Sequence, residues 1–136
     1  MSRGFTLIEL LICVLIAGVL AMVALPSWRE VVIRTHRGDA TAALYALASA
    51  QERYRLVHGR YAAQAGPSPP VGLGFDRSER GWYELRIEYA DANRFIASAR
   101  PATGSRQASD SGCRILTINE ASARGATPGS VEQCWR

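Results

Sequence analysis

The chain has 136 residues, of which 48% are hydrophobic and 21% charged, and its formal net charge is +4. This length suits one small domain, and the apolar content argues against wholesale disorder. No charged side chain lies between Leu10 and Trp28, which argues against an ordinary soluble enzyme. A second run of this length is missing, which argues against a polytopic membrane protein. The basic residues are all Arg and are scattered among acids, so a direct nucleic-acid partner is not favoured.

The three cysteines fall in two different contexts. Cys13 lies in the apolar run and is interpreted as a small hydrophobic residue. Cys113 and Cys134 lie in the polar C-terminal part, with no CxxC motif and no His near either, so the sequence predicts neither a metal site nor a cofactor. If the chain is exported, we expect a Cys113–Cys134 disulfide, worth about 3 kcal/mol on the chain-entropy model.

The N-terminal segment is long enough to cross a membrane. Its apolar stretch opens at Phe5, exceeds the core of a secretory signal peptide, and from Leu10 to Trp28 would span roughly 29 Å as a helix. Glu9 is the anomaly, because an ionised carboxylate at the centre of a membrane helix costs about 2.5–3.5 kcal/mol. Either Glu9 lies at headgroup depth, or a cationic partner is supplied later.

The run Gly4-Phe5-Thr6-Leu7-Ile8-Glu9, followed by an unbroken apolar helix and Pro26, resembles the class III signal of type IV pilins and related pseudopilins. The resemblance implies that a prepilin peptidase cuts between Gly4 and Phe5 and that the new amino terminus is N-methylated. It also implies that Glu9 pairs with the freed amine of Phe5 during filament assembly. The resulting domains are a leader (1–4), a transmembrane and assembly half of the helix (5–28) and a globular domain (29–136).

A continuous helix is predicted from Phe5 to Val57. Pro26 and, more weakly, Gly18 predict a kink or local unwinding, and the resemblance implies that the stretch between them melts in the filament. Beyond residue 27 the helix is amphipathic, with charged residues such as Arg37 on its outer faces. Its apolar stripe, expected to pack on the chain's own domain, consists of Ala40, Ala43, Leu44, Leu47, Ala50, Tyr54 and Val57.

After a helix stop at Gly59, Gly and Pro residues predict a loop as far as Gly81. Strands are predicted at 82–90, where apolar and charged residues alternate, at 94–100 and at 113–118. Residues 119–130 are predicted as loop and 131–135 as a short edge strand, and Asp110 is interpreted as a turn residue. The fold class is α+β: a long N-terminal helix, its first half transmembrane, packed on a small antiparallel sheet of three to four strands, as in pilins.

The function predicted from the resemblance is that of a structural subunit rather than an enzyme. The helix end and the Cys113…Cys134 region are most similar to PilE-type minor pilins, which implies a subunit that primes or joins a pilus serving twitching motility and adhesion. Its expected partners are other major and minor pilins, prepilin peptidase and the inner membrane, which it crosses once with a periplasmic C-terminal domain before joining the surface fibre. The alternative is a type II secretion pseudopilin. A pilin for DNA uptake would need clustered arginines, with Arg100, Arg106, Arg114 and Arg124 as candidates.

Overall fold

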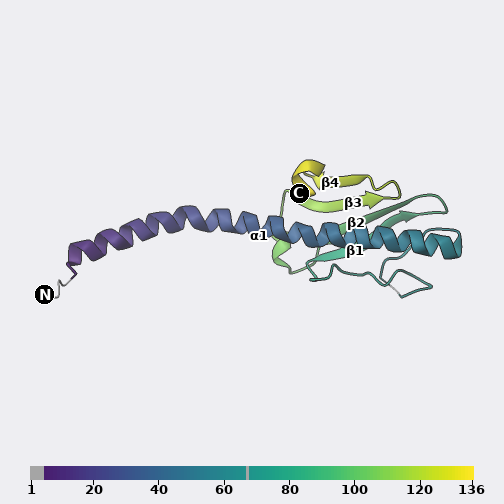
Figure 1. Cartoon of the computed structure of the whole chain (residues 1–136), viewed down its shortest axis with the longest axis horizontal. Helices are drawn as coiled ribbons and strands as arrows, with labels where there is room; N and C mark the ends of the chain where they lie inside the picture. Colours follow the sequence, from purple (N-terminus) through teal and green to yellow (C-terminus); the bar gives the residue numbers. More distant parts are fainter. Residues whose placement is uncertain (1–4, 67) are drawn as a thin grey trace. The chain divides into compact units, whose positions relative to one another are not determined.

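The computed structural model describes residues 5–66 and 68–136, and it describes residues 25–27 by their backbone alone. The elements, in chain order, are α1 (Leu7–His58), β1 (Tyr83–Ala90), β2 (Phe95–Pro101), η1 (Arg106–Ser109), β3 (Cys113–Asn119), β4 (Arg124–Pro128) and α2 (Val131–Cys134) (Figure 1). The chain divides into two compact units, Met1–Val32 and Ile33–Arg136.

Helix α1 is 52 residues long, which confirms the predicted long N-terminal helix. Ala recurs through its second half, and Ala has the highest helix propensity. The helix ends where predicted: Gly59 has a φ of +70°, and its N–H donates to the Arg55 carbonyl at 2.8 Å. A glycine adopts this left-handed conformation without the steric cost that a Cβ would bring, so Gly59 stops the helix.

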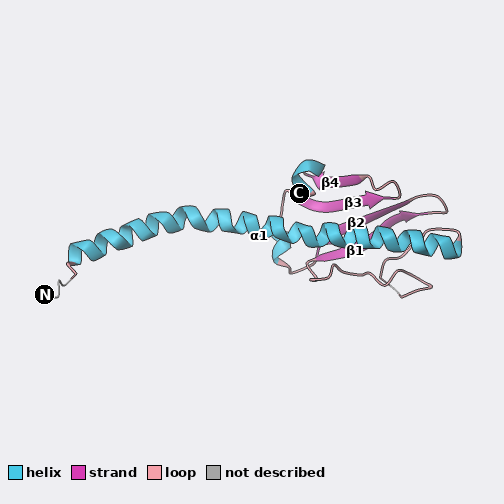
Figure 2. Ribbon diagram, viewed as in Figure 1, coloured by secondary structure: helices cyan, strands magenta, loops and turns pink. Residues whose placement is uncertain are grey.

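The four strands form one antiparallel sheet in the order β1-β2-β3-β4 (Figure 2). Tyr83 and Leu85 are buried while Glu84 and Arg86 are not, as the predicted alternation requires. The alternation was wrong at Tyr89, because a register shift between Ile87 and Tyr89 leaves this side chain exposed. Phe95 and Ala97 are likewise buried on β2, whereas Ile96 between them is exposed. The sheet therefore has one core face and one outer face, and the predicted α+β class is confirmed.

The hydrophobic core lies between α1 and the inner face of the sheet. The fully or nearly fully buried side chains include Ala40, Leu44, Leu47 and Ala50 from the helix and Tyr83, Leu85, Phe95, Leu116 and Ile118 from the strands. The predicted stripe was wrong at its end, because Val57 is 78% exposed. Gln51 accepts a hydrogen bond from the Ala62 N–H and donates one to its carbonyl, at 2.8 and 2.9 Å. The chain thus folds back to the level of Gln51, and the last turns of α1 extend past the core.

Two predictions for the C-terminal region were wrong. Residues 124–128, predicted as loop, form strand β4, whose sequence Arg-Gly-Ala-Thr-Pro lacks an apolar alternation and which is placed by backbone pairing with β3. The segment predicted as an edge strand is the short helix α2. The Ser130 hydroxyl caps it by accepting a hydrogen bond from the Gln133 N–H at 3.3 Å.

The outer strands have backbone groups engaged by neighbouring residues. At β1, the Tyr83 carbonyl accepts from the Ser78 N–H and the Leu85 N–H donates to the Asp76 carbonyl, both at 2.9 Å. At β4, the Trp135 indole N–H donates to the Gly125 carbonyl at 2.8 Å. Unpaired edge groups are templates for pairing with another chain, and these contacts cover part of each edge.

Candidate functional site

The side chain of Thr6, the residue before α1, caps the N-terminal end of the helix. The Thr6 hydroxyl accepts a hydrogen bond from the Glu9 N–H at 3.4 Å, and the Thr6 carbonyl accepts from the Leu10 N–H at 3.2 Å. Glu9 therefore lies in the first turn, where the helix dipole favours an anionic group. Thr6 followed three residues later by Glu9 is a capping-box spacing, a helix-start signal that the sequence interpretation missed.

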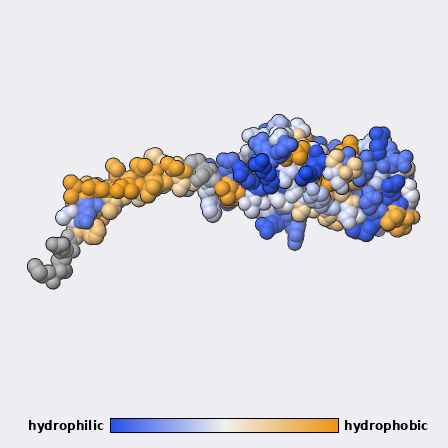
Figure 3. All heavy atoms as spheres, turned by 45° about the horizontal axis from the view of Figure 1, so that its top comes forward, coloured by the Kyte–Doolittle hydropathy of each residue, from blue (hydrophilic) through white to orange (hydrophobic). Residues whose placement is uncertain are grey.

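The first half of α1 presents an apolar surface (Figure 3). Among the described residues, no residue of its most hydrophobic 18-residue window is buried, and by length and composition the helix is able to cross a membrane. The large apolar side chains that are more than half exposed here include Phe5, Leu7, Ile8, Leu10, Leu11, Ile12, Val14, Leu15, Ile16, Val19, Leu20, Met22 and Val23.

The predicted processing and flexibility sites are only partly described by the structure. Gly4 lies outside the described residues. Phe5 precedes the helix and is 75% exposed. Gly18 and Pro26 both fall within the bounds of α1, and a Cβ built at Gly18 would meet nothing within 4 Å. The structure is that of a single subunit, so melting of the stretch between Gly18 and Pro26 in the filament stays a prediction.

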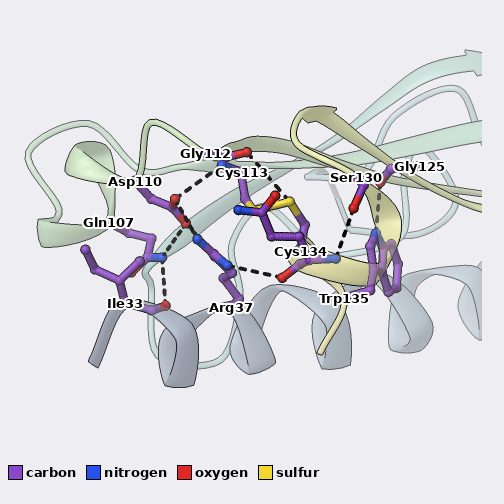
Figure 4. Close-up of a disulfide and its surroundings, with 11 residues drawn as sticks. Ile33, Arg37, Gln107, Asp110, Gly112, Cys113, Gly125, Ser130, Cys134 and Trp135 are labelled. Atoms are coloured by element: carbon purple, nitrogen blue, oxygen red, sulfur yellow. Dashed lines mark hydrogen bonds and ion pairs between the residues drawn. A yellow bond between two sulfur atoms is a disulfide. The ribbon is translucent and has the colours of Figure 1, made fainter. Parts of the chain in front are cut away.

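The predicted disulfide is present and joins the start of β3 to the end of α2. The Cα atoms of Cys113 and Cys134 are 5.6 Å apart, and both residues are fully buried. Figure 4 shows the bridge beside a network of polar side chains that come from α1 and from the segment between β2 and β3. Cys13 is exposed on the first half of α1 and is free.

A buried ion pair fixes α1 to this region. Arg37 donates from Nε and Nη2 to the two carboxylate oxygens of Asp110 at 2.7 and 2.8 Å, and its Nη1 donates to the Gln133 carbonyl at 3.3 Å (Figure 4). The side chains of Arg37 and Asp110 are only 10% and 3% exposed. A bidentate pair of this kind is strong and directional, and it sets the register of the elements that carry its two members. We call Arg37, Asp110 and their partners Gln107 and Gln133 the clamp.

Other groups complete the clamp. Gln107 donates from Nε2 to the Ile33 carbonyl at 3.1 Å and to Asp110 at 3.3 Å. The Cys113 N–H donates to Asp110 Oδ1 at 3.2 Å, so the disulfide strand holds the same carboxylate. Burial, and next the negative charge of Asp110, raise the pKa of the Tyr83 phenol far above its usual range.

The sequence interpretation missed this network. Asp110 was interpreted as a turn residue, and it does lie in the connection between η1 and β3, but its burial and its ion pair were not foreseen. Arg37 was expected outside the apolar face of the helix, and its side chain is buried as well. The two residues are 73 positions apart, and neither has a local signal that marks it as a partner of the other. Among the described residues, no group of three or more His, Cys, Asp or Glu side chains is placed to hold a metal ion.

Of the four arginines named as a possible nucleic-acid face, Arg100 and Arg124 have partners of their own, and Arg114 and Arg124 lie toward opposite ends of β3. Arg100 donates to Glu88 at 3.1 Å. The guanidinium carbon of Arg124 lies 5.8 Å from the centre of the Trp135 ring. Arg124 pairs with Ile118 near one end of β3, while Arg114 lies near its other end. Four residues along a strand separate these ends by roughly 13 Å.

Comparison with known proteins identifies the family. A model described as type IV minor pilin ComP, DNA uptake sequence receptor, matches residues 26–117. A second model, described as a prokaryotic N-terminal methylation motif, matches residues 1–25. The chain therefore belongs to the type IV minor pilin ComP family, which confirms the resemblance stated from the N-terminal motif.

Individual relatives agree with this assignment. The chain is 33% identical over 88 residues to a fimbrial protein of Neisseria meningitidis serogroup B, covering 65% of this chain and 50% of the relative. It is 34% identical over 90 residues to the type IV major pilin protein PilA of Myxococcus xanthus, covering 66% and 40%. The chain thus spans about half the length of these relatives or less.

A solved structure supports the fold. The non-core minor pilin PilV of Neisseria meningitidis superposes with a TM-score of 0.54 at 16% identity, covering 76% of this chain and 93% of that chain. At this level of identity the likeness concerns the fold alone.

Proposed function

We propose that this chain is a minor pilin, a structural subunit that primes or joins a type IV pilus and serves twitching motility and adhesion through it. Before assembly it crosses the inner membrane once, with its C-terminal domain in the periplasm. Prepilin peptidase removes residues 1–4, the new amino terminus at Phe5 is methylated, and the subunit then packs beside other major and minor pilins.

The exposed apolar surface on the first half of α1 carries this proposal. Fully burying a Leu, Ile or Val side chain gains about 1.5–3 kcal/mol relative to leaving it in water, so this helix requires an apolar environment. Lipid supplies that environment before assembly. The apolar helices of neighbouring subunits supply it in a fibre, while the second unit keeps its own closed core.

Glu9 gives the packing a register. Hydrolysis of the Gly4–Phe5 bond creates an α-amino group, whose usual pKa of about 7.7–8.0 keeps it largely protonated at neutral pH. A carboxylate and an ammonium group brought together in apolar surroundings form a directional contact, because both have lost water. Glu9 lies in the first turn of α1, so it is placed to meet this amine on a neighbouring subunit or on its own chain.

The first experiment replaces Glu9 with Gln and compares the variant with Cys13→Ala, a neutral change one helical turn further on. We expect both variants to insert into the membrane and to be cleaved normally. We expect Glu9→Gln to lower the amount recovered in sheared surface filaments by at least about tenfold, since removing one member of a buried pair costs about 3–5 kcal/mol. Wild-type incorporation of Glu9→Gln would overturn the proposed role of this acid.

The second experiment tests processing. Intact mass and N-terminal sequencing of protein from sheared filaments should show a chain that begins at methylated Phe5 and has lost Arg3, which lowers its formal side-chain charge from +4 by one. Gly4→Leu should leave an uncleaved species of higher mass in the membrane. A filament form that begins at Met1 would contradict the proposal.

A type II secretion pseudopilin is the competing role. The relatives reported above are named as pilins and fimbrial proteins, which favours the pilus. Deletion of the gene should therefore abolish twitching and spare exoprotein secretion. The reverse result would assign the chain to a secretion system.

A second candidate function, capture of DNA, is supported by the name of the matched family model. Two pairs of exposed arginines are candidates for this contact, Arg53 and Arg60 around the end of α1 and Arg106 and Arg114 on η1 and β3. Duplex DNA should bind full-length protein in detergent micelles with an affinity that falls steeply with salt. Replacing one of these Arg pairs by Gln should reduce the salt slope by up to about two. Binding that neither pair affects would exclude both surfaces.

A further inference from the structure

The outer face of the sheet carries a depression of about 340 Å³ that no role described above uses. Its lining residues are Tyr89, Arg94, Ile96, Asn119 and Glu120. Tyr89 pairs with Ile96, and Ile96 pairs with Asn119, so these three form one row across β1, β2 and β3. With strands about 4.8 Å apart, the row spans roughly 10 Å, enough for one six-membered ring to lie over Ile96.

The floor of the depression is apolar and held in place. Tyr89 and Ile96 are 46% and 42% exposed, an unusual pairing of large apolar side chains on an outer sheet face. The Tyr89 hydroxyl donates to Asp91, and this hydrogen bond raises the pKa of Tyr89. The phenol is therefore neutral and tethered, and its ring is available as a flat apolar platform.

The rim supplies both hydrogen-bond donors and acceptors. Asn119 Oδ1 accepts from the N–H groups of Ala121 and Ala123 at 3.1 and 2.8 Å, which fixes the amide and leaves its Nδ2 donors for a ligand. Glu120 accepts from the Phe95 N–H through Oε2 at 3.2 Å and retains acceptor capacity on its second oxygen. The Arg94 guanidinium lies over the Tyr89 ring, with its central carbon 6.0 Å from the ring centre, and adds further donors.

The charges of the lining select the class of ligand. The positive charge of Arg94 and the negative charge of Glu120 cancel, so the depression has no net charge to attract a phosphate backbone. A purely apolar ligand would leave the rim groups without partners, at a cost. A pyranose ring has an apolar face of C–H groups and a rim of hydroxyls that both donate and accept, which matches an apolar floor with a mixed polar rim.

We propose that this depression is a binding site for a neutral saccharide, with the sugar ring against Tyr89 and Ile96 and its hydroxyls on Asn119, Glu120 and Arg94. The site requires residues of the second unit only. It is therefore independent of Glu9, of processing and of filament assembly, and it goes beyond the structural role proposed above.

The test uses full-length protein in detergent micelles on an array of neutral oligosaccharides ending in galactose, N-acetylgalactosamine or N-acetylglucosamine, with duplex DNA as a competitor. We expect saturable binding to one of these termini that the corresponding monosaccharide displaces and that DNA does not. Tyr89→Ala should weaken it at least tenfold, whereas Tyr89→Phe, which keeps the ring, should stay within about threefold of wild type. Arg86→Ala, exposed on the same sheet face outside the depression, is the matched control and should bind as wild type.

Three results would overturn the proposal: no neutral oligosaccharide binds at millimolar concentration, Tyr89→Ala binds as well as wild type, or DNA displaces the sugar. Circular dichroism of each variant separates loss of binding from loss of folding. Pilus assembly by Tyr89→Ala should be normal, and Glu9→Gln protein in micelles should still bind the sugar. Failure of the saccharide site and failure of the pilin role are therefore distinguishable.

Discussion

The clamp makes a quantitative prediction about the stability of the second unit. In Asp110→Asn, Arg37 keeps its charge but loses the carboxylate that neutralises it. The amide oxygen in the place of Oδ1 still accepts from Arg37 Nη2 and from the Cys113 N–H, whereas the amide NH2 in the place of Oδ2 leaves Arg37 Nε without an acceptor. Removing one member of a buried pair costs about 3–5 kcal/mol. For a unit of about 100 residues, each 1 kcal/mol lowers Tm by about 4–8 °C, so we expect a fall of roughly 12–40 °C.

The assay is thermal and denaturant unfolding of full-length protein in micelles, followed by tryptophan fluorescence, in a double-mutant cycle. Arg37→Met should also destabilise the fold, and the double variant should lose less than the sum of the two by at least about 1.5 kcal/mol. Glu84→Gln is the control, because its partners Arg77 and Arg86 are exposed, and it should cost less than about 1 kcal/mol. Additive effects of Asp110→Asn and Arg37→Met would refute the reasoning.

Three further predictions concern the same unit. Replacing Cys113 and Cys134 by Ser should cost about 3 kcal/mol, measured by urea unfolding, and a loss below about 0.5 kcal/mol would show that the bridge is dispensable. The hydrogen bond from Ser98, and then Arg100, lower the pKa of Glu88 from its ordinary 4.5. The resulting stability is present above that value and lost as pH falls through the folded pKa, so Glu88→Gln should flatten the loss of Tm below pH 5. An unchanged acid limb would contradict this. Gly38→Ala should stabilise α1 by about 0.5–1 kcal/mol in the same unfolding measurement, because a Cβ there meets nothing within 4 Å; a loss of stability would argue against the described helix surface.

What the sequence predicted correctly was encoded locally. The strand at Tyr83–Ala90 follows from the alternation of its apolar and charged residues as far as Ile87, and the buried helix positions Leu44 and Leu47 follow from helical spacing. The N-terminal motif is a contiguous run of residues, so its family could be recognised before any fold was known. The disulfide was expected from two cysteines in the polar C-terminal part, on the condition that the chain is exported.

What the sequence did not reveal depends on distant residues or on backbone pairing. Arg37 and Asp110 each look like surface residues, and only the fold shows that they meet. Strand β4 is placed by its neighbour β3 rather than by its own side chains. Helix α2 did carry a signal, because Ser130 followed three residues later by Gln133 is a capping-box spacing, and the expectation of a strand overlooked it.

The covered sheet edges bear on how such a subunit polymerises. With Trp135 occupying the Gly125 carbonyl and residues 76 and 78 engaging β1, part of each outer strand is closed to hydrogen bonding by a strand from a neighbouring molecule. Crowded copies of this chain are thereby steered away from amyloid-like stacking. In the fibre proposed above, contacts between subunits are then left to the apolar first half of α1.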